Sequence, residues 1–371
     1  MKFYKGMDIS TLMEVESCGG KFYDHGENKD LLDILQSYGV NAVRLRLWND
    51  PYSEDGEPYG AGTNDLPTTI SLTKRAKAHG MDVLLDLHYS DFWADPGKQR
   101  VPKAWRGMNA DQLEKAVYDY TRDVLLKLKE ENAYPDLIQV GNEVTNGMLW
   151  PLGKMPEYDN LARFINAGIR AVRSVDKDMP IMIHLDQGGN NAMYIDWFDH
   201  YMERGEDFQI IGLSYYPFWH GGLDKLLYNM NDLARRYGKE LIVAEVSMGY
   251  TMEDYAEYEK LAPNERKGYA TKPESVENLQ FPMSKEGQKD FMQAVFDVID
   301  QVPENKCRGF FYWEPAWIPV PGSGWATEAS LPYIEEKGPC GNEWANQALF
   351  DYDGNALPAF EAVRDYKPKK S

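Results

Sequence analysis

The chain has 371 residues, 43% of them hydrophobic and 27% charged, which is the balance of an ordinary globular protein with a large core. Forty basic residues against fifty-nine acidic ones give a formal net charge of −19. That charge repels nucleic-acid phosphates and anionic membrane surfaces, so both are excluded as expected partners, whereas a neutral ligand meets no such penalty.

Strand-like apolar stretches alternate with stretches of helical periodicity along the whole chain. The eight expected strands are residues 3–9, 41–48, 82–89, 137–143, 180–186, 209–216, 240–246 and 307–313. Helices are expected between them, most clearly at 68–79, 110–130 and 285–301. The first of these follows Pro67 and stops before Gly80, and the second begins at a capping-box pattern formed by Asn109 and Gln112.

This alternation predicts an α/β protein built as a single (β/α)8 barrel, with residues 1–371 forming one catalytic domain. The main rival is an open doubly wound sheet. Against that rival, no GxGxxG or GKS/T loop follows the first expected strand. No linker-like run and no internal repeat divides the chain.

Polar and aromatic residues gather where the expected strands end. In a (β/α)8 barrel these ends form the face that carries the chemistry. The residues are Asp8, Arg46, Trp48, His88, Asp91, Asn142, Glu143, Asp186, Tyr215, Tyr216, Glu245, Trp313 and Glu314. A barrel without a site has no need for so many charges on one rim, so the pattern favours an active site there.

Two glutamates stand out in this set. Glu143 follows the apolar run LIQV, and Glu245 follows LIVA. On a barrel they end the fourth and seventh strands and face each other across the mouth. A pair of carboxyl groups flanking one bond is what glycoside hydrolysis requires, and a separation of roughly 5–5.5 Å gives retention of configuration. The alternative for each glutamate is an ordinary salt bridge.

Several longer strings resemble glycoside hydrolase family 53, the endo-β-1,4-galactanases. They are RLRLWNDP (44–51), HYSDFWADP (88–96), GNE (141–143), SYYPFW (214–219), YWEPAW (312–317) and NQALFD (346–351). The similarity runs from KGMDIS near the start to NQALFDYDGNALPAF near the end, so it covers nearly the whole chain. It implies a retaining, endo-acting enzyme that cleaves β-1,4-galactan or galacto-oligosaccharides.

The resemblance also implies roles for individual residues. Glu143 is expected to be the acid/base and Glu245 the nucleophile, with positive charge for Glu245 supplied by Arg46 or alternatively Arg44. Asn142 is expected to bind the sugar 2-hydroxyl, and Tyr216 or Tyr215 to orient the nucleophile. Further substrate contacts are expected from Trp48, Trp93, Trp313 and Trp317 as aromatic surfaces and from His88, Asp91 and Asp95 as polar groups.

Other functions remain open beside this one. A β-mannanase or endoglucanase of the same clan would use the same two glutamates, and a glycan-binding barrel without activity would lack one of them. A metal-dependent hydrolase would need an HxH pair on the first strand, which FYKGMDI lacks. No cofactor and no metal is expected. Calcium is doubtful because residues 250–282 contain no series of oxygen ligands at alternating positions.

The cysteines and the N-terminus indicate the compartment. Cys18, Cys307 and Cys340 lie far apart and suggest neither a disulfide framework nor a CxxC metal motif. The N-terminal sequence MKFYKGMDIS lacks the apolar segment of a secretory signal. As the sequence stands we expect a cytoplasmic monomer, and a secreted one if the N-terminus was trimmed.

Overall fold

The computed structural model describes residues 2–253, 273–277, 279–337 and 340–369. Eight parallel strands form a closed barrel in the order β1, β12, β11, β10, β9, β6, β5 and β4. Their bounds are β1 (Tyr4–Asp8), β4 (Ala42–Leu47), β5 (Asp82–Leu87), β6 (Leu137–Val140), β9 (Ile181–Leu185), β10 (Ile210–Tyr215), β11 (Glu240–Val246) and β12 (Cys307–Trp313). Each lies within one of the eight predicted stretches, which confirms the (β/α)8 barrel.

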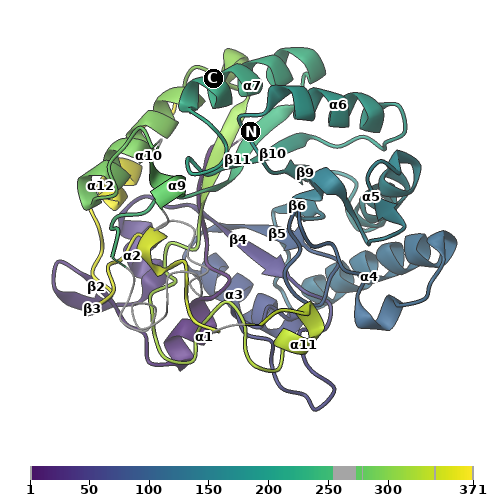
Figure 1. The fold of residues 1–371 in the computed structure, drawn as a ribbon, viewed down its shortest axis with the longest axis horizontal. Coiled ribbons are helices and arrows are strands. Elements are labelled where there is room, and N and C mark those ends of the chain that lie inside the picture. The colour runs from purple at the N-terminus through teal and green to yellow at the C-terminus, as the bar shows by residue number, and fades with distance from the viewer. Residues whose placement is uncertain (1, 254–272, 278, 338–339, 370–371) are drawn as a thin grey trace.

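Helices surround this barrel (Figure 1). The α-helices in the described residues are α1 (Leu12–Ser17), α2 (Leu31–Ser37), α3 (Leu66–Ala78), α4 (Ala110–Glu130), α5 (Tyr158–Val175), α6 (Asn191–Met202), α7 (Leu223–Tyr237), α9 (Pro273–Val276), α10 (Lys285–Ile299), α11 (Leu331–Ile334) and α12 (Ala359–Asp365). Short 3-10 helices span Lys103–Trp105, Val144–Asn146, Pro303–Asn305 and Ala345–Gln347. Two antiparallel hairpins that the sequence did not predict are β2 (Phe22–Asp24) with β3 (Glu27–Lys29), and β7 (Gly147–Met148) with β8 (Gly153–Lys154).

The predicted helix starts have identifiable caps. The Asn109 side chain accepts a hydrogen bond from the Gln112 backbone, and the Gln112 side chain accepts one from the Asn109 backbone, so α4 begins with the predicted capping box. The helix α3 begins at Leu66, two residues earlier than predicted, because Asp65 caps it. Pro67 then lies in the first turn, where its missing N–H is not needed.

The interior of the barrel has an apolar layer and a polar layer. Alternate residues of a strand point inwards. Near the N-terminal ends of the strands these are apolar and form one cluster: Tyr4, Ala42, Leu84, Leu137, Met182, Ile210, Ile242, Ala244 and Phe311. A Cβ at Gly6 would lie 2.2 Å from the Phe311 ring, so glycine makes room for it. Two to four residues further along, the same faces carry Asp8, Arg44, Arg46, Asp86, Gln139, His184 and Ser214, all buried.

A β-bulge places Glu245 in this polar layer. Leu213 of β10 lies opposite Val243 of β11, but the next residue, Ser214, lies opposite Glu245, so Ala244 is the extra residue. A bulge changes the direction in which the following side chains point. It therefore allows Glu245 to face inwards beside the other polar residues.

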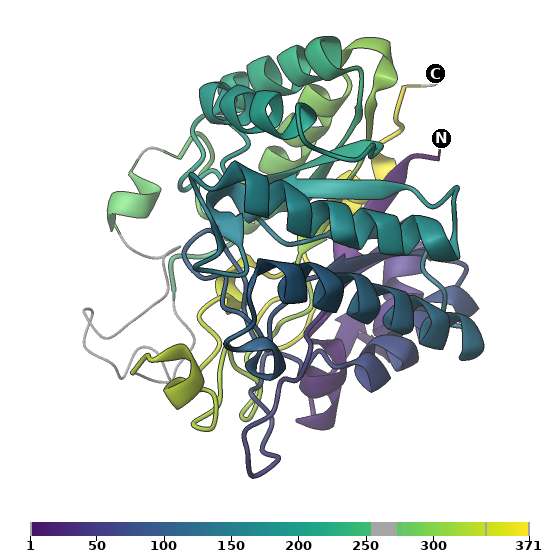
Figure 2. The ribbon, with the colours of Figure 1, turned by 90° about the vertical axis from the view of Figure 1, so that its right-hand side faces the viewer.

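The chain ends and the rim loops lie at opposite ends of the barrel. In Figure 2 both termini are at the right, while α9 (light green) and α11 (yellow-green) are at the left. No helix in the described part of the chain is long and apolar enough to cross a membrane. Most of the 250–282 stretch, on which the calcium expectation falls, lies outside the described residues.

Candidate active site

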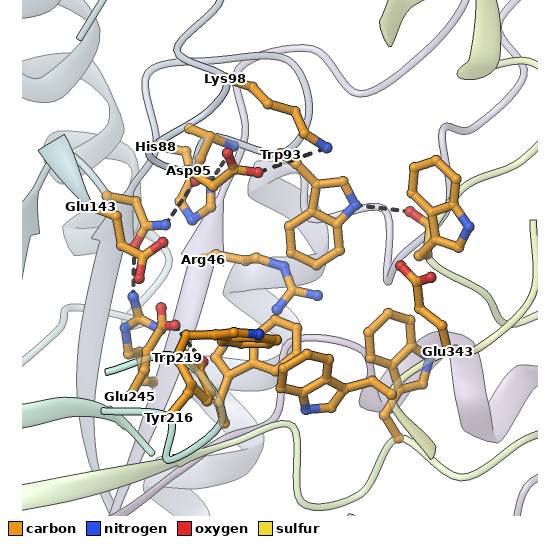
Figure 3. A pocket seen from close by; sticks show the side chains of 17 residues that line it. Arg46, His88, Trp93, Asp95, Lys98, Glu143, Tyr216, Trp219, Glu245 and Glu343 are labelled. Carbon is orange, nitrogen blue, oxygen red and sulfur yellow. Dashed lines mark hydrogen bonds and ion pairs between the residues drawn. The ribbon is translucent and has the colours of Figure 1, made fainter. Parts of the chain in front are cut away.

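A cleft opens at the C-terminal ends of the strands, directly above the polar layer (Figure 3). The side chains that line it are Arg44, Arg46, His88, Trp93, Ala94, Asp95, Lys98, Asn142, Glu143, Tyr216, Trp219, Glu245, Trp313, Trp317, Trp325, Glu343 and Trp344. All but three of the predicted site residues are among them. The exceptions are Trp48, Asp91 and Tyr215.

Glu143 is held just beyond the end of β6 rather than within the strand. Its backbone has a φ of 45°, in the left-handed region that residues other than glycine rarely adopt. The Ser214 hydroxyl donates to its Oε1 at 2.5 Å. Burial raises the pKa of Glu143 well above its usual range, and the negative charges of Glu245 and Asp186 add to the rise. These features suit a carboxyl group that keeps its proton.

Glu245 has different neighbours. Its Oε1 lies 2.8 Å from Nη1 of Arg44, and its Oε2 accepts a hydrogen bond of 2.6 Å from the Tyr216 hydroxyl. Burial raises the pKa of Glu245 too, but the Arg44 charge and the Tyr216 hydrogen bond oppose the rise. Between the two carboxyl groups, these contacts favour the ionised form on Glu245 and the protonated form on Glu143.

The two carboxyl groups are close enough to act on one bond. An oxygen of Glu143 and an oxygen of Glu245 lie within 4.8 Å of each other, and a nitrogen of His184 lies within the same distance of both. Among the described residues this trio is the grouping with the geometry of a metal site. Arg44 already contacts Glu245, however, and both ring nitrogens of His184 are within hydrogen-bonding distance of protein groups, so we assign no metal to it.

The structure decides between the two arginines that the sequence left open. Arg44, not Arg46, contacts Glu245, and it also pairs with Asp8 at 3.0 Å and Asp86 at 2.8 Å. Arg46 instead pairs with Glu314 through Nη1, at 2.5 Å. Arg44 and Arg46 lie two residues apart on β4, and both point into the barrel. Arg44 reaches the centre of the barrel, and Arg46 reaches its rim.

Arg46 forms the centre of an aromatic wall of the cleft. Its guanidinium carbon lies 4.5 Å from the centre of the Trp93 ring and 5.8 Å from that of Trp313. Trp93 in turn packs at 6.4 Å from Trp317, and its Nε1 donates to the backbone oxygen of Trp325. Rigid apolar rings of this kind offer faces on which the C–H side of a sugar can stack.

Three predicted contacts do not reach the cleft. Trp48 is fully buried, and its Nε1 donates to Nδ1 of His88. Asp91 accepts hydrogen bonds from the backbone of Asp50 and Lys103, so it holds loops together. Tyr215, the last residue of β10, is buried, and its hydroxyl donates to the backbone oxygen of Gly221.

His88 lines the cleft as expected, and both of its ring nitrogens are bound to protein groups. Its Nδ1 accepts from Trp48, which can only donate, so Nε2 carries the hydrogen and donates to Asp86 at 3.0 Å. Both nitrogens are occupied, and only the ring edge remains for a ligand. Asp95 lies in the cleft near Lys98, with 3.7 Å between Oδ2 and Nζ.

Sequence reasoning missed two groups of residues. Lys98, Trp325, Glu343 and Trp344 reach the cleft from loops without a local signal, and Trp219 ends the string SYYPFW but was not named as a site residue. The buried polar residues Gln139, His184 and Ser214 did carry a signal, since each interrupts an apolar strand at an inward position.

Comparison with known proteins shows what the chain is similar to. A family model described as Glycosyl hydrolase family 53 matches residues 4–363. The endo-β-1,4-galactanase of Bacillus subtilis (strain 168) is 37% identical, over 99% of this chain and 88% of the relative. The solved GH53 catalytic domain of Ignisphaera aggregans is 39% identical with a TM-score of 0.89, covering 98% of this chain and 96% of its own. A structure of fungal β-1,4-galactanases is 30% identical with a TM-score of 0.77, covering 99% and 100%.

Proposed function

The chain belongs to glycosyl hydrolase family 53, and we propose that it is an endo-acting enzyme that hydrolyses β-1,4-galactosidic bonds of galactan, type I arabinogalactan or their oligosaccharides. The observation that carries the proposal is the carboxyl pair of Glu143 and Glu245, whose oxygens approach within 4.8 Å at the floor of a tryptophan-lined cleft. That spacing supports retention, because no room is left between the groups for an attacking water.

The reaction proceeds in two displacements. In the first, Glu245 attacks the anomeric carbon, the bond from that carbon to the leaving oxygen breaks, and Glu143 gives its proton to this oxygen. In the second, a water molecule loses a proton to Glu143 and attacks the same carbon, which releases Glu245. Two inversions restore the β configuration.

Neighbouring side chains support these roles. Arg44 and Tyr216 keep Glu245 ionised before attack. Asn142 donates through Nδ2 to Ala94, which leaves one hydrogen of that amide for the sugar 2-hydroxyl. Trp93, Trp313 and Trp317 provide stacking surfaces along the cleft.

The same barrel could serve a β-mannanase, an endoglucanase or a glycan-binding protein without activity, and product analysis separates them. The purified protein is incubated with linear β-1,4-galactan and, in parallel, with mannan and carboxymethylcellulose. The Glu245→Gln variant is the matched control. Short galacto-oligosaccharides from galactan alone support the proposal. Products from another polymer retain the mechanism but refute the substrate, and no products from any polymer or from galacto-oligosaccharides refute the hydrolase.

Residues 1–371 are proposed to act as one catalytic domain and as a monomer. The first and last barrel strands, β1 and β12, pair along their lengths from Tyr4 opposite Gly309 to Asp8 opposite Trp313. The chain therefore closes its own barrel, and both carboxyl groups come from the same copy. Sedimentation of the active protein tests the monomer.

A further inference from the structure

A chain of hydrogen bonds runs across the barrel from the arginine of the nucleophile to the acid/base. It begins at Arg44, whose nitrogens can only donate. Arg44 Nε lies 3.2 Å from the Gln139 side chain, so the nearer atom must be the amide oxygen. The other amide atom lies 3.0 Å from the backbone oxygen of Gly141, which can only accept, so that atom must be the nitrogen. The orientation of Gln139 is thus fixed from both ends.

Gln139 in turn selects the tautomer of His184. Its Nε2 lies 3.1 Å from His184 Nδ1. A hydrogen on Nδ1 would point at the amide hydrogens of Gln139. The one oxygen near Nδ1, Asn142 Oδ1 at 3.1 Å, already accepts from Arg44 at 2.8 Å and from Gln139 at 3.0 Å. Gln139 has two amide hydrogens; one goes to Gly141 and the other is shared between Asn142 Oδ1 and His184 Nδ1, so Nδ1 is the acceptor.

The remaining nitrogen of His184 then determines the direction of the last two bonds. Burial lowers the pKa of His184 well below its usual range, and the Arg44 charge lowers it further, so the ring is neutral. Nε2 consequently carries the hydrogen and donates to the Ser214 Oγ at 2.8 Å. Ser214 has one hydrogen, and the acceptor available to it is Oε1 of Glu143 at 2.5 Å. His184 and Ser214 are both fully buried, so water does not compete for these bonds.

We propose that Ser214, oriented by Gln139 and His184, fixes the catalytic proton of Glu143 on Oε2. This inference rests on the proposed function, in which Glu143 is the acid/base. Oε1 already accepts the Ser214 hydrogen. It therefore cannot carry the acid proton on the side that faces Ser214. Oε2 has no hydrogen bond to any described residue, and Glu143 lines the cleft. Ser214, His184 and Gln139 are thus positioning residues, because they act through Glu143.

The same bond serves both halves of the reaction. When Glu143 is ionised after the first displacement, the Ser214 hydrogen bond stabilises its charge; when Glu143 is protonated, the bond keeps the acid proton directed to one side. The charged and titratable groups that face Glu143 from neighbouring elements are Asp95, His184, Asp186, Tyr194, Tyr216 and Glu245. None of them contacts Oε1 within the described residues, so Ser214 is the group to test.

The kinetic test uses Ser214→Ala, with Ser214→Thr as the variant that keeps a hydroxyl. Loss of the bond raises the pKa of Glu143, so the alkaline limb of the pH profile of kcat/KM on galactan should move up by about one pH unit. kcat on galactan should fall about tenfold with little change in KM, because the proton is no longer directed at the leaving oxygen. Nitrophenyl galacto-oligosaccharides need no proton to leave, so their rate of glycosylation should stay within about twofold. Ser214→Thr should restore both properties.

An unmoved alkaline limb in Ser214→Ala, or an equal loss on both substrates, would overturn the proposal. Neutron diffraction of the unaltered protein, at a pH below that limb, gives a test that needs no variant. Deuterium is expected on His184 Nε2, on Ser214 Oγ towards Glu143, and on Glu143 Oε2. Deuterium on His184 Nδ1 and Glu143 Oε1 would show the chain running the other way and refute the inference. The deuterium positions can be read whichever polymer the enzyme cleaves. A wrong assignment of the substrate would instead appear in the product analysis, so the two failures can be told apart.

Discussion

Replacing Tyr216 with phenylalanine removes one hydroxyl from the nucleophile and leaves the ring in place. In the native enzyme that hydroxyl donates to Glu245 Oε2 at 2.6 Å, and Tyr216 is only 6% exposed, so water cannot easily substitute. A hydrogen bond to a charged group contributes about 1.5–3 kcal/mol. At about 1.4 kcal/mol per pKa unit, its loss should raise the pKa of Glu245 by about 1–2 units.

The sign of the effect on activity follows directly. Glu245 works in its ionised form, so the acid limb of the kcat/KM profile reports its pKa. We expect this limb to move to higher pH by about 1–2 units in Tyr216→Phe, with the alkaline limb unchanged. The matched control is Tyr215→Phe, since the Tyr215 hydroxyl donates to Gly221 and not to a carboxylate. An acid limb that stays in place in Tyr216→Phe, or moves equally in both variants, would refute the reasoning.

Glu245→Gln should abolish turnover while leaving the binding of galacto-oligosaccharides largely intact, as measured by product release and calorimetry; near-normal rates would remove Glu245 as nucleophile. In Glu143→Ala, azide should restore activity only on substrates with a good leaving group and should yield a β-glycosyl azide, which chromatography detects; rescue on galactan itself would speak against the acid role. Arg44→Met leaves Asp86 and Glu245 as buried carboxylates without their cation, and Asp8 with only Arg46 at 3.6 Å, which should cost about 3–5 kcal/mol in urea unfolding. A loss below about 1 kcal/mol would mean that these carboxylates take up protons instead.

The strands were predictable because most are short apolar runs bounded by polar residues, as expected of parallel strands buried on both faces. Glu143 and Glu245 were identifiable for the same reason, as carboxylates at or within three residues of the end of such runs. The sequence could not distinguish Arg44 from Arg46, or Tyr216 from Tyr215. Those choices depend on strand tilt and on the bulge at Ala244, which only the folded barrel determines.

The loop residues of the cleft were beyond prediction on physical grounds. Trp219, Trp325 and Trp344 are brought to the cleft by the path of irregular segments, and no periodicity encodes such a path. His88 was expected in the cleft and lies there, but the sequence did not show that its ring nitrogens are bound to other protein groups. Its bond to Trp48 appears only when the neighbouring strands β4 and β5 are paired, and its bond to Asp86 depends on the ring orientation that this pairing fixes.

The left-handed backbone at Glu143 has a consequence for how this protein responds to selection. A φ of 45° costs a glutamate of the order of 1 kcal/mol, and its carboxyl group is held close to a second one at further cost. Asparagine tolerates this conformation better and carries no charge, so Glu143→Asn should raise the melting temperature while removing activity on galactan. Directed evolution for heat resistance alone would therefore drift towards inactive proteins, and a screen that also scores hydrolysis is needed to keep the enzyme.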